Sequence, residues 1–199
     1  MIKNLILDMG NVLIEFAPDR FIADLGVTDP QVHALLLEEV FHSTEWAALD
    51  QGTMDEAAAL KQICSRLPQT LWGLAERLVF HWNEPLHPVP GMAELVRDCK
   101  AAGMGIYLLS NASLRHREYW HDVPGSEYFD GVVVSANLKM VKPSPEIYRY
   151  VLDTFGLKAE ECLFVDDMRY NVAGAEAVGI YGFHFQNNAA ALWQTLFIE

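Results

Sequence analysis

The chain has 199 residues, of which 27 are acidic and 14 are basic, so its formal net charge is −13. Hydrophobic residues make up 51% of it, which indicates a core-forming globular protein and excludes a disordered acidic segment. The acidity argues against nucleic acid and against anionic membranes as partners, because both are bound through clustered Lys and Arg. Three widely spaced cysteines and the absence of a long apolar stretch favour a cytoplasmic location.

Five short apolar runs are predicted to be the strands of a parallel sheet. Unbroken rather than alternating apolar residues are typical of strands that are covered on both faces. In chain order the runs are 5–7, 106–109, 132–134, 162–165 and 181–185.

Helical patterns alternate with the last four runs. They cover 91–102, 145–155 and 170–178, and the second has Ser144 as N-cap, Pro145 at its first position and Gly156 as its stop. This alternation predicts right-handed βαβ units, and therefore an α/β fold with a Rossmann-like parallel sheet.

The segment between the first two runs contains helical patterns and no strand. Two of them cover 30–41 and 69–82, and a third begins at a capping box with Thr53 as N-cap and Glu56 at N3. A crossover needs far fewer than the roughly 70 residues present. We therefore expect an inserted helical domain over 16–85 and a core formed by 1–15 and 86–199. Its tryptophans are expected in the core of the insert; they are Trp46, Trp72 and Trp82.

Polar residues follow four of the apolar runs, at the strand ends where open α/β sheets bind ligands. Each alone has an ordinary explanation, such as a helix cap or a surface loop, but their joint placement favours a site for phosphate and Mg²⁺. Converging carboxylates repel one another unless a hard cation lies between them, and a carboxylate can attack phosphorus. In chain order the residues are Asp8, Ser110, Asn111, Lys142, Asp166 and Asp167.

The surrounding segments resemble the four ordered motifs of the haloacid dehalogenase superfamily. The first motif, Asp-x-Gly-Asn, and the second, Ser-Asn, are similar to those of the bacterial α-D-glucose-1-phosphate phosphatase subgroup. The helical insert lies where the superfamily places its small cap. The four segments are 7–13, 108–111, 141–148 and 164–167, and 171–175 fits the continuation of the last one.

The resemblance implies a role for each residue. Asp8 would be the nucleophile that accepts the phosphoryl group, and Asp167 is favoured over Asp166 as the direct metal ligand. The implied Mg²⁺ ligands are Asp8, Asp166, Asp167 and the backbone carbonyl of Gly10. The implied substrate-binding residues are Ser110, Asn111 and Lys142, and Asp8, Ser110 and Lys142 are the implied catalytic ones.

One position departs from the family. Most phosphatases of the superfamily have a second aspartate, which acts as general acid and base, two residues after the nucleophile, where this chain has Gly10. General acid catalysis is worth about 10²–10⁴-fold, so its loss favours substrates with good leaving groups. The sequence thus predicts a Mg²⁺-dependent phosphatase for a small phosphorylated metabolite. A sugar phosphate such as glucose 1-phosphate fits, with an aspartyl-phosphate intermediate.

Two alternatives stay open. One is a metal-independent haloacid dehalogenase, in which the aspartate attacks carbon. The other is a phosphometabolite-binding or regulatory protein that has lost turnover, for which Gly10 is the best evidence. The basic cluster 115–117 is expected on a solvated helix face, and the histidines, including His116 and His184, at the surface or as caps. The sequence leaves the oligomeric state open.

Overall fold

The structure is a computed structural model, and it describes residues 1–197. Its centre is a five-stranded parallel sheet with the strand order β3-β2-β1-β4-β5, which confirms the predicted α/β fold with a Rossmann-like sheet. The strands are β1 (Asn4–Leu7), β2 (Gly105–Ser110), β3 (Gly131–Val134), β4 (Cys162–Asp166) and β5 (Tyr181–His184). The first strand, β1, is the middle strand of the sheet, and later strands are added first on one side of it and then on the other. The carboxyl ends of β1 and β4 therefore flank a crevice suited to a ligand.

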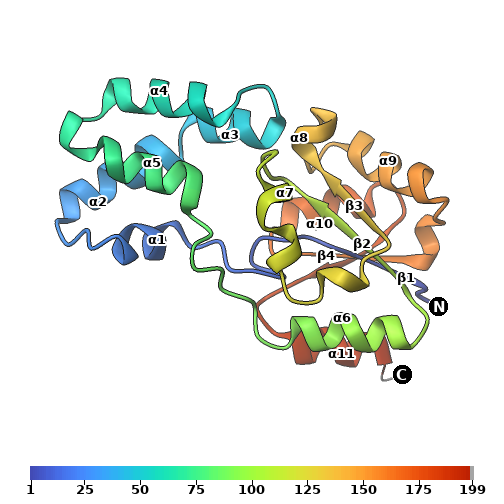
Figure 1. The fold of residues 1–199 in the computed structure, drawn as a ribbon. Coiled ribbons are helices and arrows are strands. Elements are labelled where there is room, and N and C mark those ends of the chain that lie inside the picture. The colour runs from blue at the N-terminus through green and yellow to red at the C-terminus, as the bar shows by residue number, and fades with distance from the viewer. Residues whose placement is uncertain (198–199) are drawn as a thin grey trace.

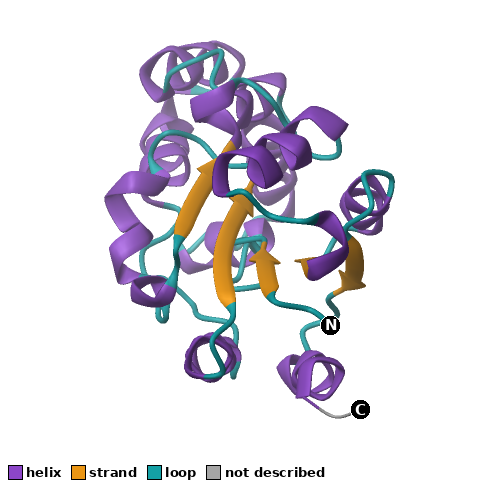
Figure 2. Ribbon diagram, turned by 90° about the vertical axis from the view of Figure 1, so that its right-hand side faces the viewer, coloured by secondary structure: helices purple, strands orange, loops and turns teal. Residues whose placement is uncertain are grey.

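Helices cover both faces of the sheet (Figures 1 and 2). Leu5 and Leu7 face the cluster that includes α6 and α11, whereas Ile6 faces the cluster that includes α9. Burial on both faces is the reason why the strands are continuous apolar runs. The helices that follow β1–β5 in the core are α6 (Met92–Ala101), α7 (His116–Tyr119), α8 (Ser135–Leu138), α9 (Pro145–Phe155), α10 (Arg169–Glu176) and α11 (Ala189–Phe197). Short 3-10 turns are η3 (Trp120–Asp122), η4 (Ser126–Tyr128) and η5 (Ala159–Glu161).

The predicted boundaries of α9 are confirmed. Ser144 is its N-cap residue, Pro145 opens the helix, and Gly156 ends it in the left-handed conformation with φ of 64°. The strand predicted over 181–185 is one residue shorter, since its last paired residue is His184.

The helices between β1 and α6 form a separate helical unit, and no strand lies among them, as expected. Figure 1 shows this helical unit standing beside the carboxyl ends of the strands. It has its own apolar cluster, in which Phe21, Ile22, Leu36 and Ile63 are buried. The boundary predicted at 16–85 stays a prediction. The helices are α1 (Pro18–Asp24), α2 (Pro30–Leu36), the π-helix η1 (Leu37–Phe41), α3 (Thr44–Gln51), α4 (Glu56–Arg66), the 3-10 turn η2 (Gln69–Leu71) and α5 (Trp72–His81).

The capping box predicted at Thr53 is wrong. Helix α4 begins at Glu56, and its N-cap is Asp55, whose Oδ1 accepts the N–H of Ala58 at 2.8 Å. The Thr53 hydroxyl instead donates to the carbonyl of Ala48 at 3.3 Å, so it belongs to the C-terminal turn of α3.

The tryptophan prediction is confirmed for two residues and wrong for one. Trp46 and Trp82 pack partly buried against the apolar cluster of the helical unit. Trp72 is 43% exposed, because its indole N–H donates to the carbonyls of Cys64 and Leu67 and holds the ring at the surface.

The two crossings between the helical unit and the core run side by side. Ile14 pairs with Pro88 in an antiparallel bridge, and the N–H of Val89 donates to the carbonyl of Leu13 at 2.9 Å. These bonds fix the position at which the helical unit leaves the sheet. Across residues 1–197, no helix is both long and apolar enough to cross a bilayer.

Candidate active site

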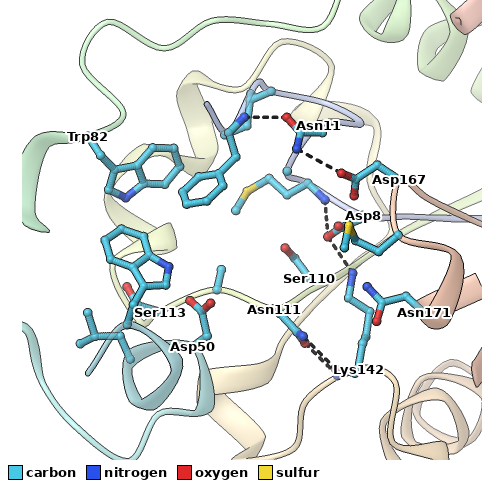
Figure 3. A pocket seen from close by; sticks show the side chains of 18 of the residues that line it. Asp8, Asn11, Asp50, Trp82, Ser110, Asn111, Ser113, Lys142, Asp167 and Asn171 are labelled. Atoms are coloured by element: carbon cyan, nitrogen blue, oxygen red, sulfur yellow. Dashed lines mark hydrogen bonds and ion pairs between the residues drawn. The ribbon is translucent and has the colours of Figure 1, made fainter. Parts of the chain in front are cut away.

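The predicted site residues converge on one cavity of about 330 Å³ between the strand ends and the helical unit (Figure 3). Ser110, at the end of β2, and Asp8, directly after β1, enter it from the sheet. The predicted residues that line the cavity are Asp8, Gly10, Ser110, Asn111, Lys142 and Asp167. Asp166 is fully buried behind this surface.

Lys142 lies between two carboxylates. Its Nζ is 2.8 Å from Asp8 Oδ1 and donates to Asp166 Oδ2 at 2.7 Å. Burial raises the pKa of Asp8 to about 6; the Lys142 charge opposes this shift and the charge of Asp166 adds to it. Burial alone would lower the pKa of Lys142, but the two carboxylates raise it, so the ammonium is retained at neutral pH.

Asn111 holds the backbone of Lys142. The Asn111 Oδ1 accepts the Lys142 N–H at 2.8 Å, and its Nδ2 donates to the Lys142 carbonyl at 3.1 Å. Gly174 allows the loop to approach α10, because a Cβ there would lie 2.8 Å from the carbonyl oxygen of Pro143. The Asn111 amide therefore orients the lysine. The residue also lines the cavity, and its predicted contact with phosphate stays a prediction.

The two neighbouring aspartates have different surroundings. Asp166 accepts hydrogen bonds from Lys142, from the N–H of Met168 at 2.8 Å and from Asn171 Nδ2 at 3.0 and 3.1 Å. Asp167 lines the cavity, and its Oδ2 accepts a hydrogen bond from Asn11 Nδ2 at 3.1 Å. Burial raises the pKa of Asp167, although the bond from Asn11 opposes this. Asp167 thus keeps acceptor capacity toward the cavity, whereas that of Asp166 is largely used.

Three carboxylates could hold a metal ion. One oxygen from each of Asp8, Asp166 and Asp167 lies within 4.8 Å of the other two. The raised pKa values of Asp8 and Asp167 show that burial disfavours these charges, which a divalent cation would offset. An all-oxygen donor set with room for water and phosphate is suited to Mg²⁺.

Two asparagines beside the site were not singled out from the sequence. Asn11 has a left-handed backbone with φ of 54°, and its Oδ1 accepts the N–H of Phe16 while its Nδ2 reaches Asp167. Asn171 binds Asp166 from α10. Both lie in segments that resemble the family motifs, and that was the only signal for them.

The wall of the cavity opposite the carboxylates is mostly apolar and aromatic. Phe16 packs edge-on against Trp82, with ring centroids 5.2 Å apart, and Trp82 packs against Tyr119 at 5.6 Å. Figure 3 shows Trp82 on the side of the cavity away from Lys142. Residues of this wall are Ile14, Phe16, Trp46, Leu49, Val79, Trp82 and Tyr119.

The solvated helix face predicted over 115–117 is wrong for His116 and Arg115. His116 is 4% exposed, and its Nδ1 is 3.0 Å from the carbonyl of Ser113. The Arg115 guanidinium donates a hydrogen bond to the carbonyl of Val79 in α5, so this segment connects the core to the helical unit. His184 is half-buried, with Nε2 2.9 Å from the carbonyl oxygen of Asp167.

Comparison with known proteins agrees with this geometry. The family model described as haloacid dehalogenase-like hydrolase matches residues 2–179. The chain belongs to this family. The sesquiterpene phosphatase astK of Aspergillus oryzae is 31% identical over 195 residues, covering 94% of the chain and 92% of the relative. The D-ribitol-5-phosphate phosphatase of Bacteroides thetaiotaomicron is 24% identical, covering 95% and 94%.

The fold is also shared with solved structures of the family. A HAD family enzyme of Bacteroides thetaiotaomicron, solved as a magnesium complex, superposes with a TM-score of 0.74 at 25% identity over 100% of this chain and 99% of that one. This structural match and the two phosphatases that align over nearly their whole length confirm the predicted HAD-like enzyme class. The glucose-1-phosphate phosphatase subgroup stays a prediction.

Proposed function

We propose that this chain is a Mg²⁺-dependent phosphatase that hydrolyses phosphate monoesters with an apolar organic group through an aspartyl-phosphate on Asp8. The observation that carries the proposal is the position of Asp8. It lies 2.8 Å from a buried lysine, beside two further carboxylates and opposite an aromatic wall. Binding alone needs no nucleophile, and this argues against a protein that has lost turnover.

In the first half of the reaction, Asp8 attacks phosphorus and the ester oxygen leaves. The Asp8 Oδ1 already accepts the N–H of Met9 at 2.7 Å and lies against Lys142, so Oδ2 is the oxygen placed to attack. Lys142 keeps its proton and neutralises charge on the transferred group, while the Ser110 hydroxyl donates to a phosphoryl oxygen. Mg²⁺, when bound, would neutralise further charge on those oxygens.

The metal would be held by Asp8, Asp167 and the backbone carbonyl of Gly10. Asp167 and Gly10 both line the cavity, and this supports the preference for Asp167 as direct ligand. Asp166 would act from behind, because its bonds to Lys142 and Asn171 orient the lysine. Asn111 has the same orienting role on the backbone side.

In the second half, water attacks phosphorus, and this releases phosphate and frees Asp8. The helical unit would act as the cap that limits water during transfer. The dehalogenase alternative fits less well, because Asp166 and Asp167 would repel a carboxylate substrate in the absence of a cation. The cytoplasmic location stays a prediction.

The substrate class follows from the apolar and aromatic wall, most of which comes from the helical unit. Apolar and aromatic side chains bind organic groups by removing their surface from water, at about 25 cal/mol per Å². The terpenoid substrate named for the Aspergillus oryzae relative has such a group. Glucose 1-phosphate is kept as a second candidate, because Asp50 and Ser113 on the same side of the cavity could bind hydroxyl groups.

The test measures phosphate release from a prenyl monophosphate, a nitrophenyl phosphate, glucose 1-phosphate and glucose 6-phosphate, with Mg²⁺ or with EDTA. We expect turnover with Mg²⁺ only, a higher kcat/KM for the prenyl ester, and no turnover by Asp8→Asn. Failure of every ester, or equal activity of the variant, would overturn the phosphatase. A preference for glucose 1-phosphate would overturn the apolar substrate class. Release of chloride from a 2-chloro acid in EDTA would favour the dehalogenase.

A further inference from the structure

Asp50 is held at the cavity by a contact between the helical unit and the core. Its helix, α3, ends at Gly52, which has φ of 72°, and a Cβ there would lie 2.1 Å from the carbonyl oxygen of Ala136. The hydroxyl of Ser135 donates to the backbone carbonyl of Asp50 and accepts the N–H of Ala112 at 3.0 Å. Ser135 is fully buried. The end of α3 is therefore fixed to the loop that follows the second motif.

The side chain of Asp50 points into the same cavity as Asp8. Figure 3 shows its carboxylate between the aromatic wall and Ser110, facing the side that carries Asp8 and Lys142. The cluster of three metal-site carboxylates does not include Asp50. Within residues 1–197, no ion pair involves this carboxylate. It is a carboxyl group at the reaction centre that the proposed mechanism has not used.

The surroundings of Asp50 favour its protonated form. Burial raises the pKa of Asp50 to about 8, the charge of Asp8 raises it as well, and that of Lys142 opposes the shift. The phenol of Tyr119, from α7, is the other titratable group close to it. A carboxylic acid that keeps its proton near neutral pH is suited to give that proton to a leaving group.

The chemistry needs such a donor. An alkoxide leaves phosphorus poorly unless it is protonated, and the position that supplies this acid in most family phosphatases is Gly10. We propose that Asp50, on the helical unit, is the general acid and base of this enzyme. The inference rests on the proposed phosphatase function and adds a catalytic residue to it.

The two steps balance as follows. As Asp8 Oδ2 bonds to phosphorus, the P–O bond to the organic group breaks, and its ester oxygen takes the proton of the Asp50 carboxyl to leave as an alcohol. Water then attacks phosphorus and gives a proton to the Asp50 carboxylate, while the bond between phosphorus and Asp8 breaks. Inorganic phosphate leaves, and both aspartates return to their starting states.

Because a proton donor matters most for poor leaving groups, the test compares esters of increasing leaving-group basicity. Rates of the wild-type protein and of Asp50→Asn are measured with Mg²⁺ on nitrophenyl, phenyl and primary-alkyl phosphates. We expect kcat of the variant to fall about 10²–10⁴-fold on the alkyl esters and less than about 10-fold on the nitrophenyl ester. Asp24→Asn is the matched control, because this exposed carboxylate ends α1 of the same unit.

Three results would overturn the assignment. The first is an equal loss of kcat on all esters. The second is a rise in KM with kcat unchanged, which would indicate a substrate-binding role for Asp50. The third is that Asp50→Asn changes neither parameter. The wild-type protein gives a second measurement that does not depend on folding of the variant. Its kcat should fall at alkaline pH for alkyl esters and not for the nitrophenyl ester, and the same pH profile for both would contradict the proposal. An inactive wild-type protein would instead refute the phosphatase function itself.

Discussion

Replacing the nucleophile should stabilise the metal-free protein at neutral pH. Asp8 is 8% exposed, and its pKa rises from an ordinary 3.8 to about 6 because burial disfavours the carboxylate. Asn resembles the protonated carboxyl in size and in its lack of charge. Asp8→Asn therefore removes a charge that the fold holds at a cost in free energy.

The sign and the size follow from proton linkage. Since the pKa is higher in the folded state, the folded protein keeps the proton while the unfolded chain releases it, so stability falls as pH rises from 3.8 toward 6. Each pKa unit corresponds to about 1.4 kcal/mol, so the whole shift costs about 3 kcal/mol above pH 6. The variant escapes this cost, and its advantage disappears below pH 3.8.

The assay is urea unfolding of both proteins in EDTA at several pH values on either side of the Asp8 pKa. The difference in unfolding free energy should grow to about 3 kcal/mol in favour of the variant and then level off. The control Asp24→Asn should stay within about 0.5 kcal/mol of wild type throughout. Mg²⁺ should reverse the order, because it binds the wild-type site more tightly. A wild-type protein more stable than the variant at neutral pH in EDTA would refute the reasoning.

Three further predictions concern the junction, the wall and the first motif. Gly52→Ala should destabilise the protein by more than about 1 kcal/mol. It should also lower kcat on alkyl esters, because the new Cβ meets the Ala136 carbonyl and displaces the helix end that carries Asp50. Gly26→Ala, with φ of 79° and open space around it, should show the strain alone, and an equal effect of both on urea unfolding would contradict this. Trp82→Ala should raise KM for a prenyl ester with little change in kcat, because Trp82 lines the cavity. The control Trp193→Ala, in α11, should change neither parameter. A fall in kcat alone for Trp82→Ala would contradict a substrate-binding role of the wall. Adding Gly10→Asp to the Asp50→Asn variant should restore turnover of alkyl phosphates. There is room for the side chain, because the nearest atom to a Cβ at Gly10 is 3.6 Å away in Phe16. A double variant as slow as Asp50→Asn would contradict this prediction.

The part of the site that follows the strands could be predicted from the sequence. Asp8, Ser110 and Asp166 each come directly after an apolar run, Asp167 follows Asp166, and the parallel sheet brings those ends to one edge. The pattern marks chemistry there because polar side chains interrupt an otherwise buried core. Local sequence is sufficient for this inference.

Residues placed by tertiary contacts could not be predicted in this way. Asp50 belongs to an ordinary helix end, and only the close approach of Gly52 to Ala136 brings it to the cavity. His116 looked solvated beside two arginines, but it is buried at the junction with the helical unit. The sequence favoured Thr53 as the N-cap of α4, but Asp55 has this role, and the Thr53 hydroxyl belongs to the turn that ends α3.

The most direct test of the central claim is to follow oxygen from labelled water during turnover of a phosphate monoester with Mg²⁺. If Asp8 attacks phosphorus, and water then attacks the phosphorus of the aspartyl-phosphate, mass spectrometry will find ¹⁸O in the released phosphate and none in the peptide that contains Asp8. Label in the Asp8 carboxylate would show attack of water on its carbonyl carbon, and labelled phosphate produced by Asp8→Asn would show that this residue is not the nucleophile. Either result would contradict the account.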